Sequence, residues 1–435
     1  MPKLAVHGGD KAVPERHVEW PMVSETDKRA VMAVMERRIF FDAFAPEVKA
    51  LQEEWAEYVG TKHALVTNSG TSALHIAVAA AGVGPGDEVI TSAMTYVATA
   101  HAIMHQNGIP VFVDIAPKTY NIDPGKIEAR ITERTKAIIP VHLHGLPADM
   151  DEINAIAKKH NVIVIEDACQ AHGATYKGKK AGNLADMAGF SFNGSKNLPG
   201  GEGGVFTTNS DEFKRRANLV RVLGEALEEG VERDYDAFEI GWMYRTQEMI
   251  AAYVRCRLRT LDQENGVRVE NAAYLTKHLG ALPGIIPPYV PSDRTTVHHL
   301  YRLRFDPKPL GLNVSPKEFR AKVQKALRAE GVQAQRWQNR PVPMQTLFQE
   351  RKGYGEGCPW MCPFGNQARQ APERLDDYPE TKKLVDDSFV MHSAIYPPNG
   401  QPLLENYVEA FRKLWDNLDE VMDVAFEPGE IYLRD

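Results

Sequence analysis

The chain has 435 residues, of which 43% are hydrophobic and 25% are charged, and its formal net charge is −7. This composition lies close to the average of soluble globular proteins, so it disfavours a disordered, fibrous or membrane protein. The acidic balance, without a cluster of Lys and Arg, disfavours a nucleic-acid-binding role. A chain of this length exceeds the size of one hydrophobic core, so we expect a large domain and a smaller one.

Short β-rich segments alternate with helical patterns between residues 60 and 210, which predicts an α/β domain with a mostly parallel sheet covered by helices. Strands such as NVIVIED at 161–167 are apolar on both faces, as a sheet buried on both sides requires. The seven expected strands cover residues 63–68, 88–92, 110–114, 137–142, 161–167, 188–192 and 204–208. Helices are expected at residues 47–58, 71–81, 95–106, 150–160, 211–222, 247–261, 268–279, 316–330 and 405–424.

A proline-rich stretch, LPGIIPPYVPSD at residues 282–293, interrupts the helical pattern before the β-rich run HHLYRLRF. This break predicts a domain boundary between about 260 and 290. We therefore expect an N-terminal arm and a large domain over residues 1–260, and a small C-terminal α+β domain over residues 261–435. The Pro- and Gly-rich residues 340–380 are expected to form loops.

Several residues that could bind or react with a ligand follow predicted strands. Ligands of doubly wound sheets bind at these strand ends. Gly70, Thr71 and Ser72 open a helix directly after a strand, and the free N–H groups at such a position suit a phosphate. Taken alone, hydroxyl residues at a helix start are more often ordinary N-caps. Asp167 ends the most apolar strand, where a carboxylate needs a cation, such as a protonated pyridine nitrogen, or hydrogen-bond donors. A helix N-cap is an equally good explanation of Asp167 in isolation.

Lys196 lies between an apolar strand and the glycine-rich run PGGEGG at residues 199–204. An imine-forming lysine needs such a dry position, because its amine must be partly neutral. The glycines let the backbone approach a flat ring closely. Most lysines lie on the surface, but this setting is not typical of a surface residue. Tyr96 follows another strand and is suited to stacking on a ring, although aromatic residues are more often part of a core.

The chain resembles the DegT/StrS-type sugar aminotransferases, a branch of the fold-type I pyridoxal-phosphate enzymes. The resemblance is carried by NSGTSAL, PGDEVITSAMTYVATA, VHLHGLPADMD, VIEDACQAHGATYKGKKAGN and above all GFSFNGSKNLPGGEGGVFTTN. It implies that Lys196 forms the Schiff base with pyridoxal 5'-phosphate and that Asp167 pairs with the pyridinium nitrogen. It further implies that Gln170 contacts the cofactor near its phenolic oxygen and that Tyr96 stacks on the ring. The residues implied to hold the phosphate are Gly70, Thr71, Ser72 and Ser191.

The resemblance also implies a homodimer in which residues 241–245 of one subunit complete the active site of the other. The sequence departs from the family pattern here, because Met243 stands where the family usually has an Asn that reaches the partner's phosphate. The contact between subunits must then be weaker or come from another residue, such as Arg245. Leu223 replaces a common His before Gly224, which puts the substrate loop in doubt.

The implied reaction is a ping-pong transfer of an amino group from glutamate or glutamine to a keto-sugar or keto-cyclitol, such as a scyllo-inosose-like ketone. Nucleotide-linked keto-sugars are the alternative acceptors. The length of the chain and residues 340–380, which could cover the site, favour a cyclitol or a sugar without a nucleotide. A regulatory protein that binds the cofactor without turnover is the alternative outside the enzymes. We expect a cytoplasmic protein, because residues 1–20 lack an apolar signal core, four cysteines make no disulfide framework, and no apolar run approaches ~18 residues.

Other polar residues have weaker claims to a function. His142 and His144 have a metal-like spacing but no ligand set beside them, and Cys358 and Cys362 lack a second cysteine pair. His172, His298 and His299 either face the substrate or make structural contacts. For Arg302 and Arg304, the expected location is the surface, and binding of a phosphate or carboxylate is the alternative.

Overall fold

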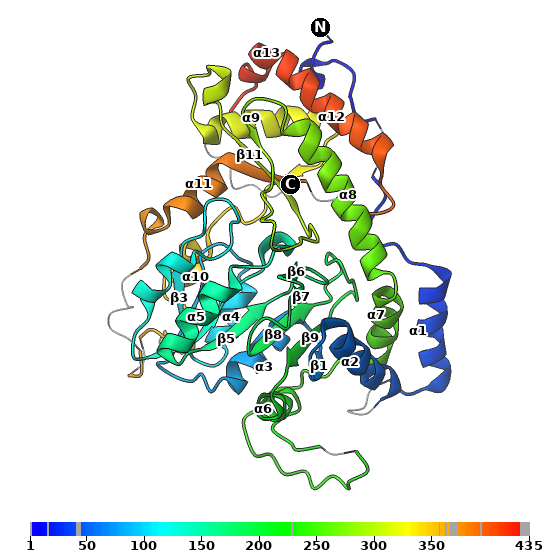
Figure 1. Cartoon of the computed structure of the whole chain (residues 1–435), viewed down its shortest axis with the longest axis vertical. Coiled ribbons are helices and arrows are strands. Elements are labelled where there is room, and N and C mark those ends of the chain that lie inside the picture. Colours follow the sequence, from blue (N-terminus) through cyan, green and yellow to red (C-terminus); the bar gives the residue numbers. More distant parts are fainter. Residues whose placement is uncertain are drawn as a thin grey trace.

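The computed structural model describes residues 2–14, 17–40, 45–227, 229–355, 357–361, 363–365, 372–391 and 394–426. Its larger lobe is built on a seven-stranded sheet with the strand order β1-β9-β8-β5-β4-β2-β3 (Figure 1). The strands are β1 (His63–Thr67), β2 (Glu88–Ser92), β3 (Ile109–Val113), β4 (Thr135–Ile139), β5 (Ile163–Asp167), β8 (Met187–Ser191) and β9 (Gly204–Thr208). All seven expected strands are confirmed; β2 and β9 have the expected bounds, and the ends of the other five shift by at most three residues.

The sheet is mostly parallel, because β3, β2, β4, β5 and β8 pair in parallel while β9 runs antiparallel to both β8 and β1. The strands β2, β3, β8 and β9 are buried along their whole length. Their apolar sequences are explained by this burial, since helices cover both faces of the sheet. The expected fold class is therefore confirmed.

Seven helices belong to the part of the chain before residue 261. They are α1 (Glu25–Arg37), α2 (Pro46–Val59), α3 (Gly70–Ala80), α4 (Ala98–Met104), α5 (Met150–His160), α6 (Asp211–Arg221) and α7 (Glu248–Leu258). Helix α3 carries apolar residues on almost every side, because it packs against the sheet and also against α4 and α6. This central helix begins at the carboxyl end of β1, so the sheet fixes the place of its N-terminus.

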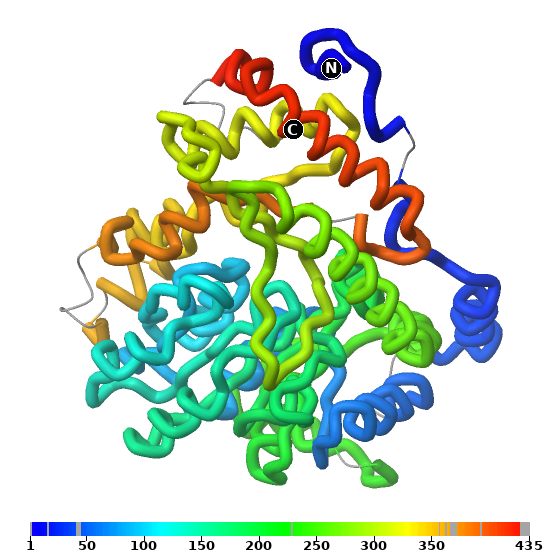
Figure 2. The backbone as a smooth tube through the Cα atoms, turned by 45° about the horizontal axis from the view of Figure 1, so that its top comes forward, coloured from blue at the N-terminus to red at the C-terminus, as the bar shows by residue number. Residues whose placement is uncertain are grey.

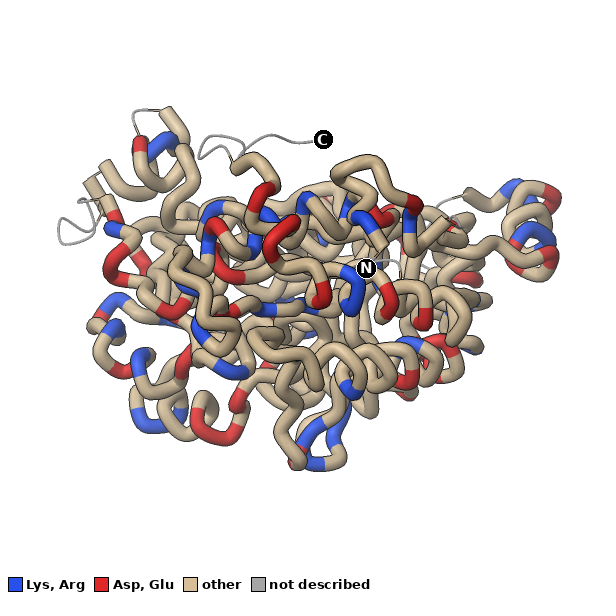
Figure 3. The backbone as a smooth tube through the Cα atoms, turned by 90° about the horizontal axis from the view of Figure 1, so that it is seen from above, with Lys and Arg blue, Asp and Glu red and all other residues tan. Residues whose placement is uncertain are grey.

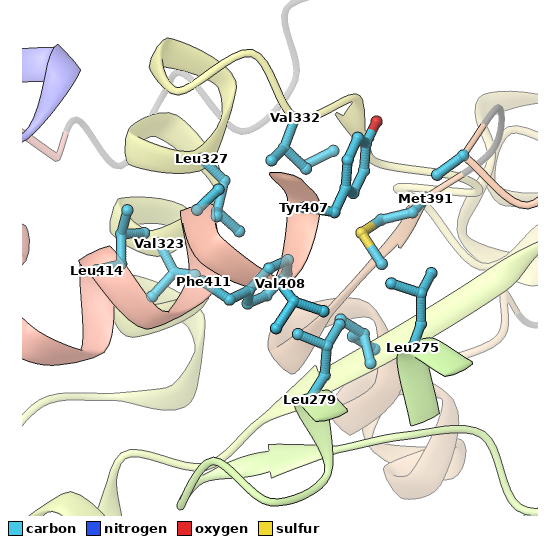
Figure 4. Packing of buried hydrophobic residues seen from close by; sticks show 14 of the residues in the cluster. Leu275, Leu279, Val323, Leu327, Val332, Met391, Tyr407, Val408, Phe411 and Leu414 are labelled. Carbon is cyan, nitrogen blue, oxygen red and sulfur yellow. The ribbon is translucent and has the colours of Figure 1, made fainter. Parts of the chain in front are cut away.

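The second lobe has its own four-stranded antiparallel sheet, with the order β10-β11-β13-β12. Its strands are β10 (Ile285–Ile286), β11 (Tyr301–Phe305), β12 (Ala334–Gln335) and β13 (Ser388–Met391), and its helices are α8 (Leu261–Leu279), α9 (Pro316–Ala329), α11 (Pro379–Asp387), α12 (Gln401–Asp416) and α13 (Leu418–Met422). Side chains of α8, α9, α12 and β13 meet in a common core (Figure 4). Leu4 and Val13 are buried in the same core, so the start of the chain packs on this lobe. The exact boundary between the domains stays a prediction.

Three expectations about the elements need correction. Helix α1 was not among the expected helices, although Ser24 and Asp27 form a capping box at its start. A gap was expected before residue 268, but α8 continues from Leu261 through Gly266 to Leu279. Residues 340–380 are not only loops, because they contain α10 (Thr346–Gln349) and the start of α11. Val342, Phe348, Trp360 and Tyr378 form a core with β3 and α4, so the described residues of this segment pack on the large lobe.

Figures 2 and 3 show the path of the N-terminal residues and the distribution of charge. The first residues lie beside α12 at the top of the second lobe, and the chain then descends past α8 to α1 (Figure 2). Acidic and basic residues are interspersed along the backbone seen from above (Figure 3). Within the described ranges, no helix is both long and apolar enough to cross a bilayer.

Candidate active site

The candidate active site lies at the carboxyl ends of neighbouring strands in the large sheet. Asp167 ends β5 and Ser191 ends β8, and these two strands pair directly. Strand β1 is joined to β8 through β9, and α3 begins just after β1. The turn with Lys196 follows β8. The topology thus brings together the three segments that the sequence analysis singled out.

Asp167 is buried, with 5% of its surface exposed. The hydroxyl group of Thr99 donates a hydrogen bond to one carboxylate oxygen of Asp167 at 2.7 Å, and the backbone N–H of Cys169 donates to the other at 3.2 Å. No Lys, Arg or His of the described residues forms an ion pair with Asp167. A buried carboxylate with two donors but no cation is suited to a cationic ligand group.

Lys196 lies in the turn after β8, where its backbone N–H donates to the carbonyl oxygen of Asn193 at 2.8 Å. Burial lowers the pKa of the Lys196 amine, and the nearby Cys169 and Asp167 partly oppose this effect. The amine has no ion-pair partner among the described residues. Because a lower pKa increases the neutral fraction of the amine, this environment favours nucleophilic attack on a carbonyl group.

The N-terminus of α3 presents backbone N–H groups beside the end of β8. The Ser69 side chain caps the helix by accepting from the N–H of Ser72, and the Ser72 hydroxyl donates to the side chain of Asn68 at 2.6 Å. Gly70 lies so close to Ser191 that a β-carbon at Gly70 would come within 2.6 Å of the Ser191 β-carbon. Thr71 is half-buried beside them. Gly70, Thr71, Ser72 and Ser191 therefore share one small region with the positive end of a helix dipole.

Replacing Gly70 by Ala tests this close packing. The new methyl group would be 3.0 Å from the Ser191 α-carbon and 2.6 Å from its β-carbon. We expect G70A to lower the free energy of unfolding by about 1–3 kcal/mol and to weaken cofactor binding. Gly84→Ala is the control, because a β-carbon at Gly84 meets nothing within 4 Å. Urea unfolding of both variants should show the loss in G70A alone, and equal stability would contradict the packing.

Two glycines of the glycine-rich run lie in close contact with other parts of the protein. A β-carbon at Gly204 would come within 2.4 Å of the Ser69 carbonyl oxygen and 2.6 Å of the Phe190 carbonyl oxygen. At Gly200, a β-carbon would be 2.7 Å from the side chain of Val254. These glycines are therefore required for close contact with other parts of the protein. The expectation that the glycine-rich run lets the backbone approach a flat ring stays a prediction.

Gln170 connects the site to the second lobe. Its side-chain oxygen accepts from the backbone N–H of His144 at 2.9 Å, and Arg302 donates to Nε2 of the His144 ring at 2.9 Å. Burial lowers the pKa of His144 far below its usual value, so the ring is neutral and can accept this bond. The expectation that Arg302 and Arg304 lie on the surface is wrong. Both are buried, and Arg304 forms an ion pair with Asp387 at 2.6 Å.

Tyr96 and the segment 241–245 lie at the open side of the site. Tyr96 is 57% exposed, so it is not part of the core. Asn68, next to the helix N-terminus, donates from its backbone N–H to the carbonyl oxygen of Tyr244 at 2.8 Å. The Met243 side chain is 46% exposed, and Arg245 Nε lies 3.3 Å from its sulfur. Residues 241–245 thus run beside the N-terminus of α3, where we expect the phosphate to bind, and the Met243 side chain points outward.

The other candidate residues have structural contacts. Nε2 of His142 lies 2.8 Å from a carboxylate oxygen of the buried Glu166, and no cluster of three potential metal ligands occurs among the described residues. His172 packs against Trp55 and two Phe rings, and burial lowers its pKa to about 3. His298 lines a cavity of about 580 Å³ beside α8, whereas His299 is buried without lining it. The backbone N–H of Cys358 donates to the carbonyl oxygen of Tyr354 at 3.0 Å, and Cys362 lies outside the described residues.

Two residues that contact the site were missed by the sequence analysis. Thr99 binds Asp167, and the indole N–H of Trp20 donates to the carbonyl oxygen of Lys196 at 3.1 Å. Thr99 follows Tyr96 by three residues, so its place in the first turn after a strand was a usable signal. For Trp20, no local pattern in the sequence indicates this contact.

Comparisons with known proteins agree with this geometry. The profile of the DegT/DnrJ/EryC1/StrS aminotransferase family matches residues 21–367. The chain belongs to this family. A pleiotropic regulatory protein of Geobacillus stearothermophilus is 40% identical over 339 residues, which cover 77% of this chain and 85% of the relative. A putative L-glutamine:3-amino-2,3-dideoxy-scyllo-inosose aminotransferase of Streptomyces kanamyceticus is 32% identical over 97% of this chain and 99% of the relative.

Among solved structures, S. venezuelae DesV in complex with a ketimine intermediate is 31% identical and has a TM-score of 0.77, covering 90% of this chain and 94% of its own. The protein is an aminotransferase, and the enzymes of its family depend on pyridoxal phosphate. The described residues fit that group, because a buried carboxylate without a cation, a half-buried lysine with a lowered pKa and a helix N-terminus meet at one edge of the sheet.

Proposed function

We propose that this enzyme transfers an amino group from glutamate or glutamine to a keto-cyclitol or a keto-sugar without a nucleotide, by a ping-pong mechanism. The observation that carries the proposal is the placement of two groups after neighbouring strands, the buried Asp167 at the end of β5 and the half-buried Lys196 in the turn after β8. Lys196 has a lowered pKa and no counter-ion among the described residues, while Asp167 has donors but no cation. Lys196 is suited to bond with the aldehyde of pyridoxal phosphate, and Asp167 is suited to pair with its protonated ring nitrogen.

Lys196 and Asp167 have different roles in the proposal. When bound, pyridoxal phosphate supplies an aldehyde that condenses with amines and a ring that withdraws electrons from the substrate carbon. Lys196 holds the cofactor between turnovers and, once displaced by the donor, its neutral Nζ takes the proton from the donor's α-carbon. Asp167 keeps the ring nitrogen protonated, and the hydroxyl of Thr99 keeps the Asp167 carboxylate oriented.

The remaining predicted residues bind and orient the cofactor. In our proposal, Gly70, Thr71, Ser72 and Ser191 hold the phosphate at the start of α3, where the helix dipole favours an anion. Tyr96 covers one face of the cofactor ring, and its exposed side chain is accessible for this contact. Gln170 lies near the ring's phenolic oxygen.

We further propose a homodimer in which Arg245 compensates for the Asn that Met243 replaces. Support comes from the long connection between α6 and α7, which projects from the large lobe (Figure 1). This loop exposes an unusual set of large apolar side chains, namely Leu223, Val231, Tyr235, Phe238, Ile240 and Met243. Exposed apolar area of this extent is typical of an interface between proteins.

The choice of acceptor rests on two observations. The relative from Streptomyces kanamyceticus, whose name specifies an amino-dideoxy-inosose, aligns over almost the full length of both chains. The segment 342–360 packs on β3 and α4, and the N–H of Val342 donates to the carbonyl oxygen of Ala93, close to Tyr96. Burial raises the pKa of Tyr244 to about 12, and Tyr354 of this segment is close enough to add to that rise. We propose that this segment limits the space available to the acceptor, which favours an acceptor without a nucleotide.

A regulatory role is the second candidate, because one relative is named as a pleiotropic regulatory protein. A regulator needs no reactive lysine, whereas the buried environment of Lys196 supports turnover. The two candidates differ in one simple property. Only an enzyme converts its bound cofactor to the amine form when glutamate or glutamine is added.

A product assay tests the proposal. The purified protein is incubated with glutamate or glutamine and with one acceptor of each class: scyllo-inosose, a free keto-hexose and a nucleotide-linked keto-sugar. We expect the amino product from the cyclitol or the free sugar, together with a shift of the cofactor's visible band to shorter wavelength. A product from the nucleotide-linked sugar alone would overturn the acceptor class. The absence of any band shift with both donors would overturn the function.

A further inference from the structure

The segment from His17 to Trp20 links the two lobes at the candidate active site. His17 contacts the hydroxyl group of Tyr407 on α12, and the N–H of Val18 donates to the side chain of Asn399 at 3.3 Å. Both partners belong to the second lobe. Two residues later, Trp20 reaches the turn of the large lobe that contains Lys196. In Figures 1 and 2 this part of the chain descends from the second lobe toward α1.

Trp20 holds the backbone of the reacting lysine directly. Its indole N–H donates to the carbonyl oxygen of Lys196 at 3.1 Å. The next side chain, Asn197, donates to the side chain of Asn265 at 2.8 Å and to the carbonyl oxygen of Val297 at 2.9 Å. The peptide unit after Lys196 is therefore fixed from two sides, by the N-terminal segment and by α8.

The Trp20 ring is itself held by a buried arginine. The guanidinium group of Arg268 lies 4.4 Å from the Trp20 ring centre and 3.8 Å from that of Tyr396, and these two rings are in edge contact at 5.5 Å. Arg268 is fully buried, and none of its three guanidinium nitrogens has a hydrogen-bond partner among the described residues. Burial lowers the pKa of Arg268, because a buried cation without an ion-pair partner is costly. The electron-rich faces of the two rings, the Tyr396 side chain and the nearby Glu264 carboxylate offset this cost.

We propose that Trp20, clamped by Arg268 and Tyr396, is a positioning residue that sets the direction of the Lys196 side chain. The direction of a side chain follows from the orientation of its own backbone, and the hydrogen bond to the Lys196 carbonyl group fixes that orientation. The cation over the indole withdraws electron density and strengthens the N–H as a donor. This inference rests on the proposed role of Lys196 as the reacting lysine.

The chain offers a matched pair of variants for the test. Trp20→Phe removes the N–H but keeps a ring for Arg268. Trp415→Phe removes an equivalent bond, because the indole N–H of Trp415 donates to the carbonyl oxygen of Pro283 at 2.9 Å on the surface of the second lobe. If the loss of an indole–carbonyl hydrogen bond affects only the stability of the protein, W20F and W415F should behave alike.

The first readout needs no cofactor. Acetic anhydride labels the amines of the apo-protein at a series of pH values, and peptide mapping follows the Lys196 peptide. In W20F the amine leaves its dry position, so we expect the midpoint of Lys196 labelling to rise by about half a pH unit or more. In W415F the midpoint stays at the wild-type value. In the complete enzyme, W20F should lower kcat about tenfold with the KM of the donor within about twofold.

Arg268→Met provides a second variant if W20F does not fold. It removes the buried cation and keeps an apolar stem. The free energy of unfolding, measured in urea, should therefore equal or exceed that of the wild type. Its labelling midpoint should move in the same direction as that of W20F. Equal midpoints and equal kcat in W20F, W415F and the wild type would overturn the positioning role. If the cofactor is not attached to Lys196 in the wild-type enzyme, the proposed function fails instead.

Discussion

Lys196→Ala is expected to lower the rate of amino transfer by at least about a thousandfold, because it removes both the attachment point of the cofactor and the group that moves the proton. The amine is the only part of Lys196 that takes part in this chemistry. The fold should survive, since Lys196 forms no ion pair among the described residues and its backbone bonds remain. Steady-state kinetics and the visible spectrum of the cofactor measure the effect.

Lys179→Ala is the control for this prediction. Lys179 is an exposed lysine on the short strand β7 (Lys179–Lys180), in the hairpin that follows the segment with Asp167. Its removal should leave kcat and the spectrum unchanged. Activity of K196A within about tenfold of the wild type would contradict the role of Lys196.

Asp167→Asn should lower kcat by about a hundredfold, which corresponds to about 2.7 kcal/mol. The amide keeps the shape of the side chain, and its oxygen can still accept from Thr99 or Cys169. The negative charge that keeps the ring nitrogen protonated is lost. The ring then withdraws electrons less strongly, so the donor's α-proton is released more slowly.

Asp186→Asn is the matched control, because the exposed Asp186 also accepts from a backbone N–H, that of Val164, at 2.9 Å. We expect D186N to retain full activity. An equal loss in both variants would show that the effect of D167N is structural. Retention of wild-type kcat in D167N would remove Asp167 from the mechanism.

The elements that the sequence predicts best are those with a strong local cause. The strands β5 and β8 are apolar on both faces because they are buried on both faces, and the residues at their ends are therefore predictable as well. Helix α1 was missed because most of its side chains are polar or exposed, and only Asp27 and Val34 are buried. The continuation of α8 through Gly266 was missed because packing between the lobes outweighs the helix-breaking tendency of glycine.

The site shows the same division between local and distant causes. Lys196 and Asp167 are predictable from their own segments, since a charged residue after an apolar strand is unusual. Trp20 contacts Lys196 across 176 residues of sequence, and Thr99 contacts Asp167 across 68. Arg302 and Arg304 look like surface residues on a strand because their partners, His144 and Asp387, come from other elements. Such contacts depend on the tertiary structure and leave no local pattern.

The most direct test of the account is to reduce the enzyme with borohydride in the presence of its cofactor and to map the modified peptide. Reduction makes the bond between the cofactor and its lysine permanent, so the attachment point can be identified by mass spectrometry. We expect one modified residue, in the peptide that contains Lys196. A cofactor adduct on another lysine, or a protein that carries none after reduction, would contradict it.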